Sequence, residues 1–109
     1  MGLPITITAD PHRWRVRVGD TVLGETSAAL LLDEAGNRPT LYVPRADMQM
    51  ALFTATERAT TCPWKGKASY FSVVGLQNVV WSYETPHDRV APIAGYLAFY
   101  PQVTVERRD

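Results

Sequence analysis

The stretch Arg13-Trp14-Arg15-Val16-Arg17-Val18 decides the fold class, because charged and large apolar side chains alternate strictly along it. Alternation with a period of two places the tryptophan and both valines on one face of a β-strand and the three guanidinium groups on the other. Gly19-Asp20 then supplies a turn before residues 21–23, which we interpret as the partner strand of a hairpin. The stretch therefore predicts an antiparallel β structure.

The same short period continues along most of the chain. Apolar and β-branched runs bounded by glycine, proline or polar turn residues predict further strands. They cover residues 5–8, 28–32, 41–43, 68–75, 79–84, 96–100 and 103–106. Residues 45–53 are the exception, because Pro44 suits a helix start, Asp47 favours the positive end of a helix dipole, and apolar residues follow at helical spacing. We expect a mainly β (α+β), compact antiparallel domain with one short helix near residues 45–53 and a polar connection over 54–61.

Length and composition narrow the class of protein. The 109 residues fit a single domain, and 46% of them are hydrophobic, which is enough for a core. Eleven Lys and Arg residues balance eleven Asp and Glu residues, which argues against a dedicated nucleic-acid binder. No apolar run approaches the ~20 residues that cross a bilayer, and the N-terminus lacks a signal-peptide pattern. With one cysteine, Cys62, no internal disulfide forms, and we expect a cytoplasmic protein without a membrane or nucleic-acid partner.

The segment Thr61-Cys62-Pro63-Trp64-Lys65-Gly66-Lys67-Ala68-Ser69-Tyr70-Phe71 resembles the hallmark of a family known as domain of unknown function 427. Residues 42–47, 80–86 and 93–100 resemble further parts of that family's pattern. The resemblance implies a compact, mainly β fold of the Mss4-like or β-tent kind, and it implies no activity. Relatives with that fold often hold zinc through paired cysteines. Because this chain has no Cys-x-x-Cys pair, the resemblance implies no metal site and no cofactor.

Cys62 and Lys65 are candidate catalytic residues. The thiolate is the reactive form of a cysteine, and a nearby cation favours it. Lys65 lies three residues after Cys62, and Pro63 and Gly66 suit a tight turn that presents both groups to a small anionic ligand. The alternative is that Cys62 is a small buried hydrophobic residue and that the Lys65 stem covers Trp64.

Six further residues are candidate ligand-binding residues: Glu34, Tyr42, Arg45, Asp47, Tyr70 and Tyr83. The two acids flank a strand that leads into the expected helix, whose first N–H groups and Arg45 can bind an anion. Both Tyr70 and Tyr83 combine an apolar ring with a hydrogen-bonding hydroxyl, as pocket residues do. The alternatives are that Asp47 serves the helix end, that Glu34 is a solvated turn residue, and that the aromatic rings only form the core.

Two functions remain open. The first is a binding domain, or an enzyme, that holds a small anionic or polar ligand near Cys62 and Lys65. The second is a non-enzymatic protein-interaction module in which the Cys-Pro-Trp-Lys-Gly segment is a structural turn. We interpret the arginine stripe formed by Arg13, Arg15 and Arg17 as a solvated strand face rather than a phosphate site. Phosphate-loop, dinucleotide-binding and zinc-protease motifs do not occur in the sequence.

Overall fold

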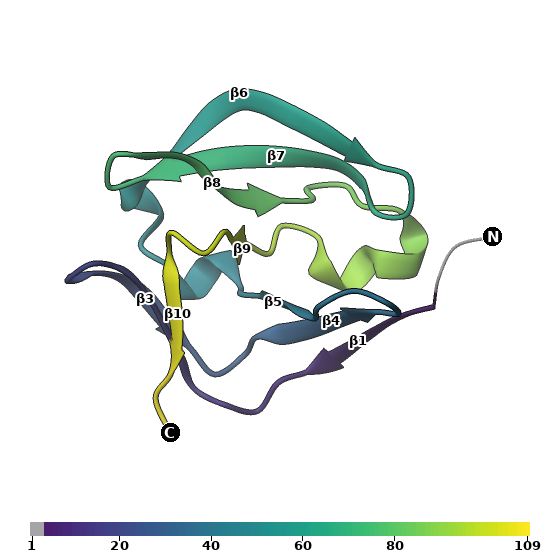
Figure 1. The fold of residues 1–109 in the computed structure, drawn as a ribbon, viewed down its shortest axis with the longest axis horizontal. Helices are drawn as coiled ribbons and strands as arrows, with labels where there is room; N and C mark the ends of the chain where they lie inside the picture. Colours follow the sequence, from purple (N-terminus) through teal and green to yellow (C-terminus); the bar gives the residue numbers. More distant parts are fainter. Residues whose placement is uncertain (1–3) are drawn as a thin grey trace.

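Three antiparallel sheets make up the computed structural model, which describes residues 4–109 (Figure 1). The first sheet contains β1 (Ile5–Ala9), β4 (Leu30–Glu34) and β5 (Thr40–Tyr42), in that order. The second has the order β10 (Thr104–Arg107), β2 (Trp14–Val18) and β3 (Thr21–Thr26). The third has the order β6 (Phe53–Cys62), β7 (Gly66–Val73), β8 (Leu76–Ser82) and β9 (Ala98–Phe99). The predicted mainly β, antiparallel fold is confirmed.

The hairpin that the alternating arginines predict lies in the second sheet. Val18 pairs with Thr21, so that Gly19 and Asp20 form a two-residue turn between β2 and β3. Gly19 has a φ of 56°, a left-handed conformation that glycine adopts at little cost. Val16 is fully buried at the middle of β2, as its place on the apolar face of the strand predicts.

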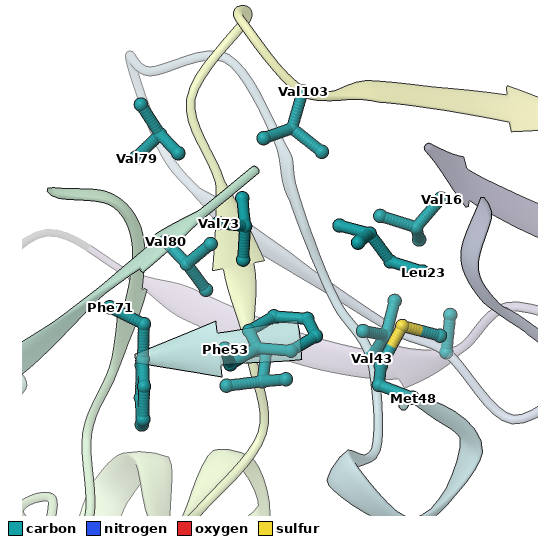
Figure 2. Close-up of a cluster of buried hydrophobic side chains, with 12 residues drawn as sticks. Val16, Leu23, Val43, Met48, Phe53, Phe71, Val73, Val79, Val80 and Val103 are labelled. Atoms are coloured by element: carbon teal, nitrogen blue, oxygen red, sulfur yellow. The ribbon is translucent and has the colours of Figure 1, made fainter. Parts of the chain in front are cut away.

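The larger of two core clusters fills the space between the second and third sheets (Figure 2). In this cluster Phe53 and Phe71 pack edge to face, with ring centroids 6.3 Å apart. Val43 and Leu97 belong to the same cluster and pair with each other through an isolated β-bridge. The smaller cluster contains three tyrosines among aliphatic residues: Leu32, Tyr42, Ala68, Tyr70, Tyr83, Val90, Ile93 and Ala98. Because tyrosine carries a hydroxyl that needs a polar neighbour, this second cluster marks where the core meets a polar site.

The structure corrects the expected helix over residues 45–53. Two 3-10 turns occur instead, η1 (Arg45–Asp47) and η2 (Met50–Leu52), and Met48 between them is extended, with φ −111° and ψ 149°. Met48 forms a β-bridge with Gly24 of β3, and the Gln49 N–H donates to the Leu23 carbonyl over 2.8 Å. Backbone groups that a continuous helix would use for its own hydrogen bonds therefore pair with β3. Within residues 4–109, no helix is long and apolar enough to span a bilayer.

Residues 54–61, expected as a polar connection, form most of β6. This strand is the edge strand of the third sheet, and most of its residues after Phe53 are exposed. Its register with β7 shifts between Ala55 and Ala59, which further weakens the alternation of apolar and polar residues. Its threonines favour an extended backbone, but they do not alternate with apolar residues, so the alternation that reveals the other strands is missing here.

Candidate functional site

The turn between β6 and β7 holds Cys62 and Lys65 in a fixed geometry. Cys62 pairs directly with Gly66 across the two strands, so that residues 63–65 form the turn. Gly66 has a φ of 113°, which disfavours any residue with a side chain. The backbone N–H of His87 donates to the Lys65 carbonyl over 2.9 Å, which ties the turn to the segment before η3 (Asp88–Ile93).

The Lys65 ammonium group joins two residues that are far apart in the sequence. Lys65 Nζ donates to Glu34 Oε1 over 3.0 Å and to Cys62 Sγ over 3.7 Å. The Lys65 and Glu34 side chains are only 14% and 11% exposed. Glu34 is thus a buried residue at the end of β4, not the solvated turn residue of the alternative interpretation. Because both partners are largely removed from water, salt screens this ion pair much less than a surface pair.

A cavity of about 300 Å³ opens beside this ion pair; we call it the tyrosine pocket. Five of the predicted site residues line it: Glu34, Tyr42, Lys65, Tyr70 and Tyr83. The remaining lining residues are Leu32, Asn37, Arg38, Thr40, Trp81 and Tyr100. Cys62 is half-buried and is not among the lining residues, so it reaches the pocket through its contact with Lys65.

Two of the tyrosine hydroxyls in the pocket form hydrogen bonds with neighbouring side chains. Trp81 Nε1 donates to the Tyr42 hydroxyl over 3.4 Å, and the hydroxyls of Tyr70 and Thr60 lie 2.8 Å apart. Burial raises the pKa of Tyr42 to about 12, and burial likewise raises the pKa of Tyr83. Both hydroxyls therefore keep their protons at neutral pH and can donate hydrogen bonds to an acceptor in the pocket.

The raised pKa of Tyr42 predicts a loss of stability at high pH. The unfolded chain, whose tyrosine pKa is about 10, releases this proton before the folded protein does. The contribution of Tyr42 is complete below about pH 10 and is lost as pH rises toward 12, where about 2 kcal/mol of unfolding free energy should be gone. Urea unfolding across this range checks the prediction. Tyr42→Phe should lose less stability than the wild type over this range; equal losses in the two proteins would refute the prediction.

Arg45 and Asp47 do not line the tyrosine pocket. Arg45 donates through Nε to the Gly95 carbonyl over 2.9 Å, and it pairs with Glu84. Asp47 accepts a hydrogen bond of 2.7 Å from the Thr26 hydroxyl. The helix start at which we expected these residues to bind an anion does not form, because residues 45–47 make only a three-residue 3-10 turn. The contacts of both side chains join segments of the fold to one another.

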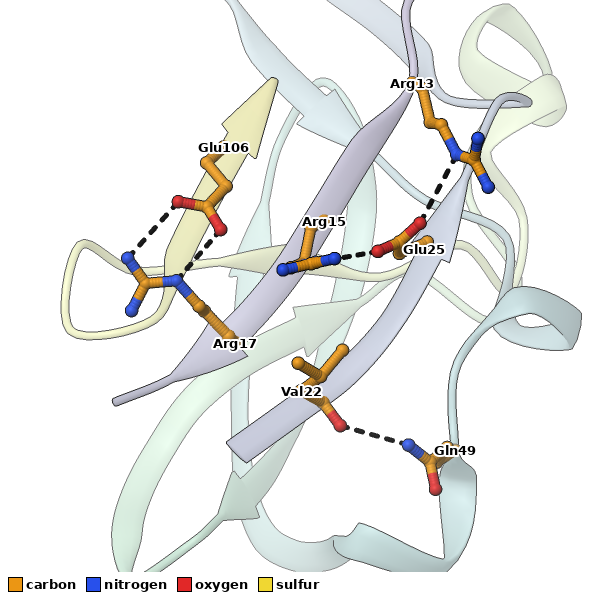
Figure 3. Close-up of polar contacts among 7 residues, drawn as sticks. All are labelled: Arg13, Arg15, Arg17, Val22, Glu25, Gln49 and Glu106. Atoms are coloured by element: carbon orange, nitrogen blue, oxygen red, sulfur yellow. Dashed lines mark hydrogen bonds and ion pairs between the residues drawn. The ribbon is translucent and has the colours of Figure 1, made fainter. Parts of the chain in front are cut away.

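The arginine stripe is paired with acids on the neighbouring strands (Figure 3). Arg15 Nε lies 2.7 Å from Glu25, which also contacts Arg13, and Arg17 Nε lies 2.9 Å from Glu106. The hydrogen bond from Arg15 lowers the pKa of Glu25, and the one from Arg17 lowers the pKa of Glu106. Three arginines thus share two acids, so these ion pairs balance all but one positive charge of the stripe.

Sequence reasoning missed three polar residues that line the pocket: Asn37 and Arg38 from the β4–β5 connection, and Thr40 at the start of β5. The only available signal was their position directly after Glu34. Among residues 4–109, no group of three or more His, Cys, Asp or Glu residues is arranged to hold a metal ion.

Residues 6–109 match the model of a family described as "Domain of unknown function (DUF427)". The matched range includes both partners of the Lys65–Glu34 ion pair and every residue that lines the tyrosine pocket. No curated protein matches the chain.

Proposed function

We propose that this chain, which belongs to the domain of unknown function (DUF427) family, binds a small polar organic anion in the tyrosine pocket. One observation carries the proposal: a single cavity is lined by a largely buried Lys65–Glu34 ion pair and by four tyrosines, two from β5 and β7 and two from the segments that follow β8 and β9. Pockets with a few convergent polar groups on a rigid scaffold are typical ligand sites.

The charges that line the pocket favour an anion. Lys65 and Glu34 neutralise each other, whereas Arg38 has no ion-pair partner among the described residues 4–109. The pocket lining thus carries one uncompensated positive charge. A ligand with a single negative charge would balance it, and the guanidinium fork matches the geometry of a carboxylate.

Lys65 and the tyrosines would hold the polar groups of this ligand. An ammonium group has three N–H donors, and the contacts with Glu34 and Cys62 occupy two of them. The third is free to donate to a ligand oxygen. The hydroxyls of Tyr42 and Tyr83 are further donors. In this proposal Cys62 is a positioning residue, because its sulfur helps to orient the ammonium group.

Calorimetric titration with lactate and with its neutral isostere lactamide tests the proposal. Lactate offers a carboxylate and a hydroxyl, and we expect it to bind more tightly than lactamide. Arg38→Gln should weaken lactate binding about tenfold, since a hydrogen bond to a charged group contributes roughly 1.5–3 kcal/mol. The matched control Arg89→Gln changes an exposed arginine outside the pocket lining and should have no effect. Absence of lactate binding, or equal affinity for lactamide, would contradict the proposal.

A further inference from the structure

A second hollow lies next to the tyrosine pocket. It has a volume of about 310 Å³, and we call it the apolar cleft. Its lining residues are Arg38, Pro39, Thr40, Leu41, Trp81, Phe99 and Val105. Most of these side chains are apolar, in contrast to the ion pair and hydroxyls of the tyrosine pocket.

The two hollows share a wall. Arg38, Thr40 and Trp81 line both of them, so the apolar cleft and the tyrosine pocket meet at these three residues. Strand β5 contributes to both hollows because successive side chains of a strand point to opposite faces. Tyr42 lines only the tyrosine pocket, whereas Leu41 lines only the apolar cleft. A ligand that crosses the shared wall would meet polar groups on one side and hydrocarbon on the other.

Trp81 is the aromatic residue of this wall, and its neighbours fix its position. Its Nε1 donates to the Tyr42 hydroxyl, which turns the polar edge of the indole toward the tyrosine pocket. Its ring packs against Tyr100, with centroids 4.7 Å apart. The apolar part of the indole is then left to line the cleft, as expected for an amphipathic aromatic residue between a polar and an apolar environment.

We infer that the ligand is an amphipathic organic acid, with a hydroxylated, singly charged head in the tyrosine pocket and a hydrocarbon tail in the apolar cleft. This inference rests on the proposed function. The uncompensated charge of Arg38 lies at the shared wall, where it would pair with the carboxylate of the head. The tail would cover Leu41, Phe99 and Val105, and burial of apolar surface favours binding.

A series of 2-hydroxy acids of increasing chain length tests the inference. We expect each methylene added from lactate to 2-hydroxyhexanoate to tighten binding roughly two- to fourfold, since transfer of a methylene from water is favourable. Val105→Thr should reduce the gain in affinity per methylene and leave lactate affinity unchanged, because it adds a hydroxyl only to the cleft. The control Val22→Thr changes a half-buried valine of the same sheet outside the cleft lining and should keep the full gain.

Pro39→Ser, at an exposed position of the cleft, provides a second variant should Val105→Thr prevent folding. If the wild type binds lactate but its affinity does not rise with chain length, the inference of an amphipathic ligand is overturned and the proposed function stands. An equal gain in affinity per methylene in the wild type and the cleft variants would also overturn this inference. Loss of binding across the whole series, lactate included, would overturn the proposed function as well.

Discussion

Lys65→Met is expected to lower the free energy of unfolding by about 2–3 kcal/mol, because it leaves the Glu34 carboxylate largely buried without its partner. The value should lie below that for a fully buried pair, since the pocket admits water to the carboxylate. Methionine preserves the apolar length of the side chain, so that little packing is lost. Urea unfolding at neutral pH measures the change.

A matched variant and a double variant separate the ion pair from general effects of the substitution. Lys67→Met removes an exposed lysine two residues further along, in β7, and should change stability by less than about 0.5 kcal/mol. Replacing Glu34 with glutamine in the Lys65→Met background should restore part of the loss, because no buried charge then remains. If Lys65→Met is as stable as Lys67→Met, the ion pair does not hold the site together.

Gly24→Ala is expected to destabilise the protein by about 3 kcal/mol or more, at the upper end of overpacking effects. A Cβ at this position would collide with the Asp47 carbonyl and lie 2.7 Å from the Met48 methyl carbon and 3.0 Å from its Cα. Since two of these atoms belong to the backbone, rotation of a side chain cannot relieve the clash. The same contact forms the β-bridge between Gly24 and Met48. Thermal and urea unfolding both measure the loss.

Gly75→Ala is the matched control for this variant. Gly75 has a φ of 77°, and a Cβ there would meet nothing within 4 Å. The substitution should therefore cost only about 1–2 kcal/mol for the left-handed conformation. Were Gly24→Ala no more destabilising than Gly75→Ala, close contact between β3 and the residue 45–52 segment would not be an essential feature of the fold.

The β class could be predicted from the sequence because strand alternation is local. The stretch Arg13–Val18 shows both faces of β2 without reference to any other part of the chain. The short helix could not be excluded in this way, since Met48 is extended only through its bridge to Gly24, which lies 24 residues earlier. The exposed edge strand β6 was missed for the opposite reason, because it has no regular apolar face to detect.

The set of residues that line the tyrosine pocket could be predicted only in part. Tyr70 and Tyr83 were chosen for their chemistry, and both line the pocket together with Glu34, Tyr42 and Lys65. What the sequence could not indicate was that Lys65 pairs with Glu34, because Glu34 ends a strand of the first sheet, whereas Lys65 lies in a turn of the third sheet, and the two meet only through tertiary folding.

Other interpretations remain predictions. Arg45 and Asp47 were grouped with Glu34 on the assumption of a helix start, which does not form. Catalysis by Cys62 and Lys65, the Mss4-like or β-tent fold and the protein-interaction module likewise remain predictions.

The most direct test of the account is a titration of nitrogen-15-labelled protein with lactate, followed by amide chemical shifts. We predict that the shifts concentrate around the tyrosine pocket, at Arg38, Lys65 and Tyr83. Val74 and Asn78, which line a separate hollow by the β7–β8 hairpin, should stay unchanged. Shifts confined to that hairpin, or none at saturating lactate, would contradict the claim that the buried Lys65–Glu34 pair forms part of a binding site.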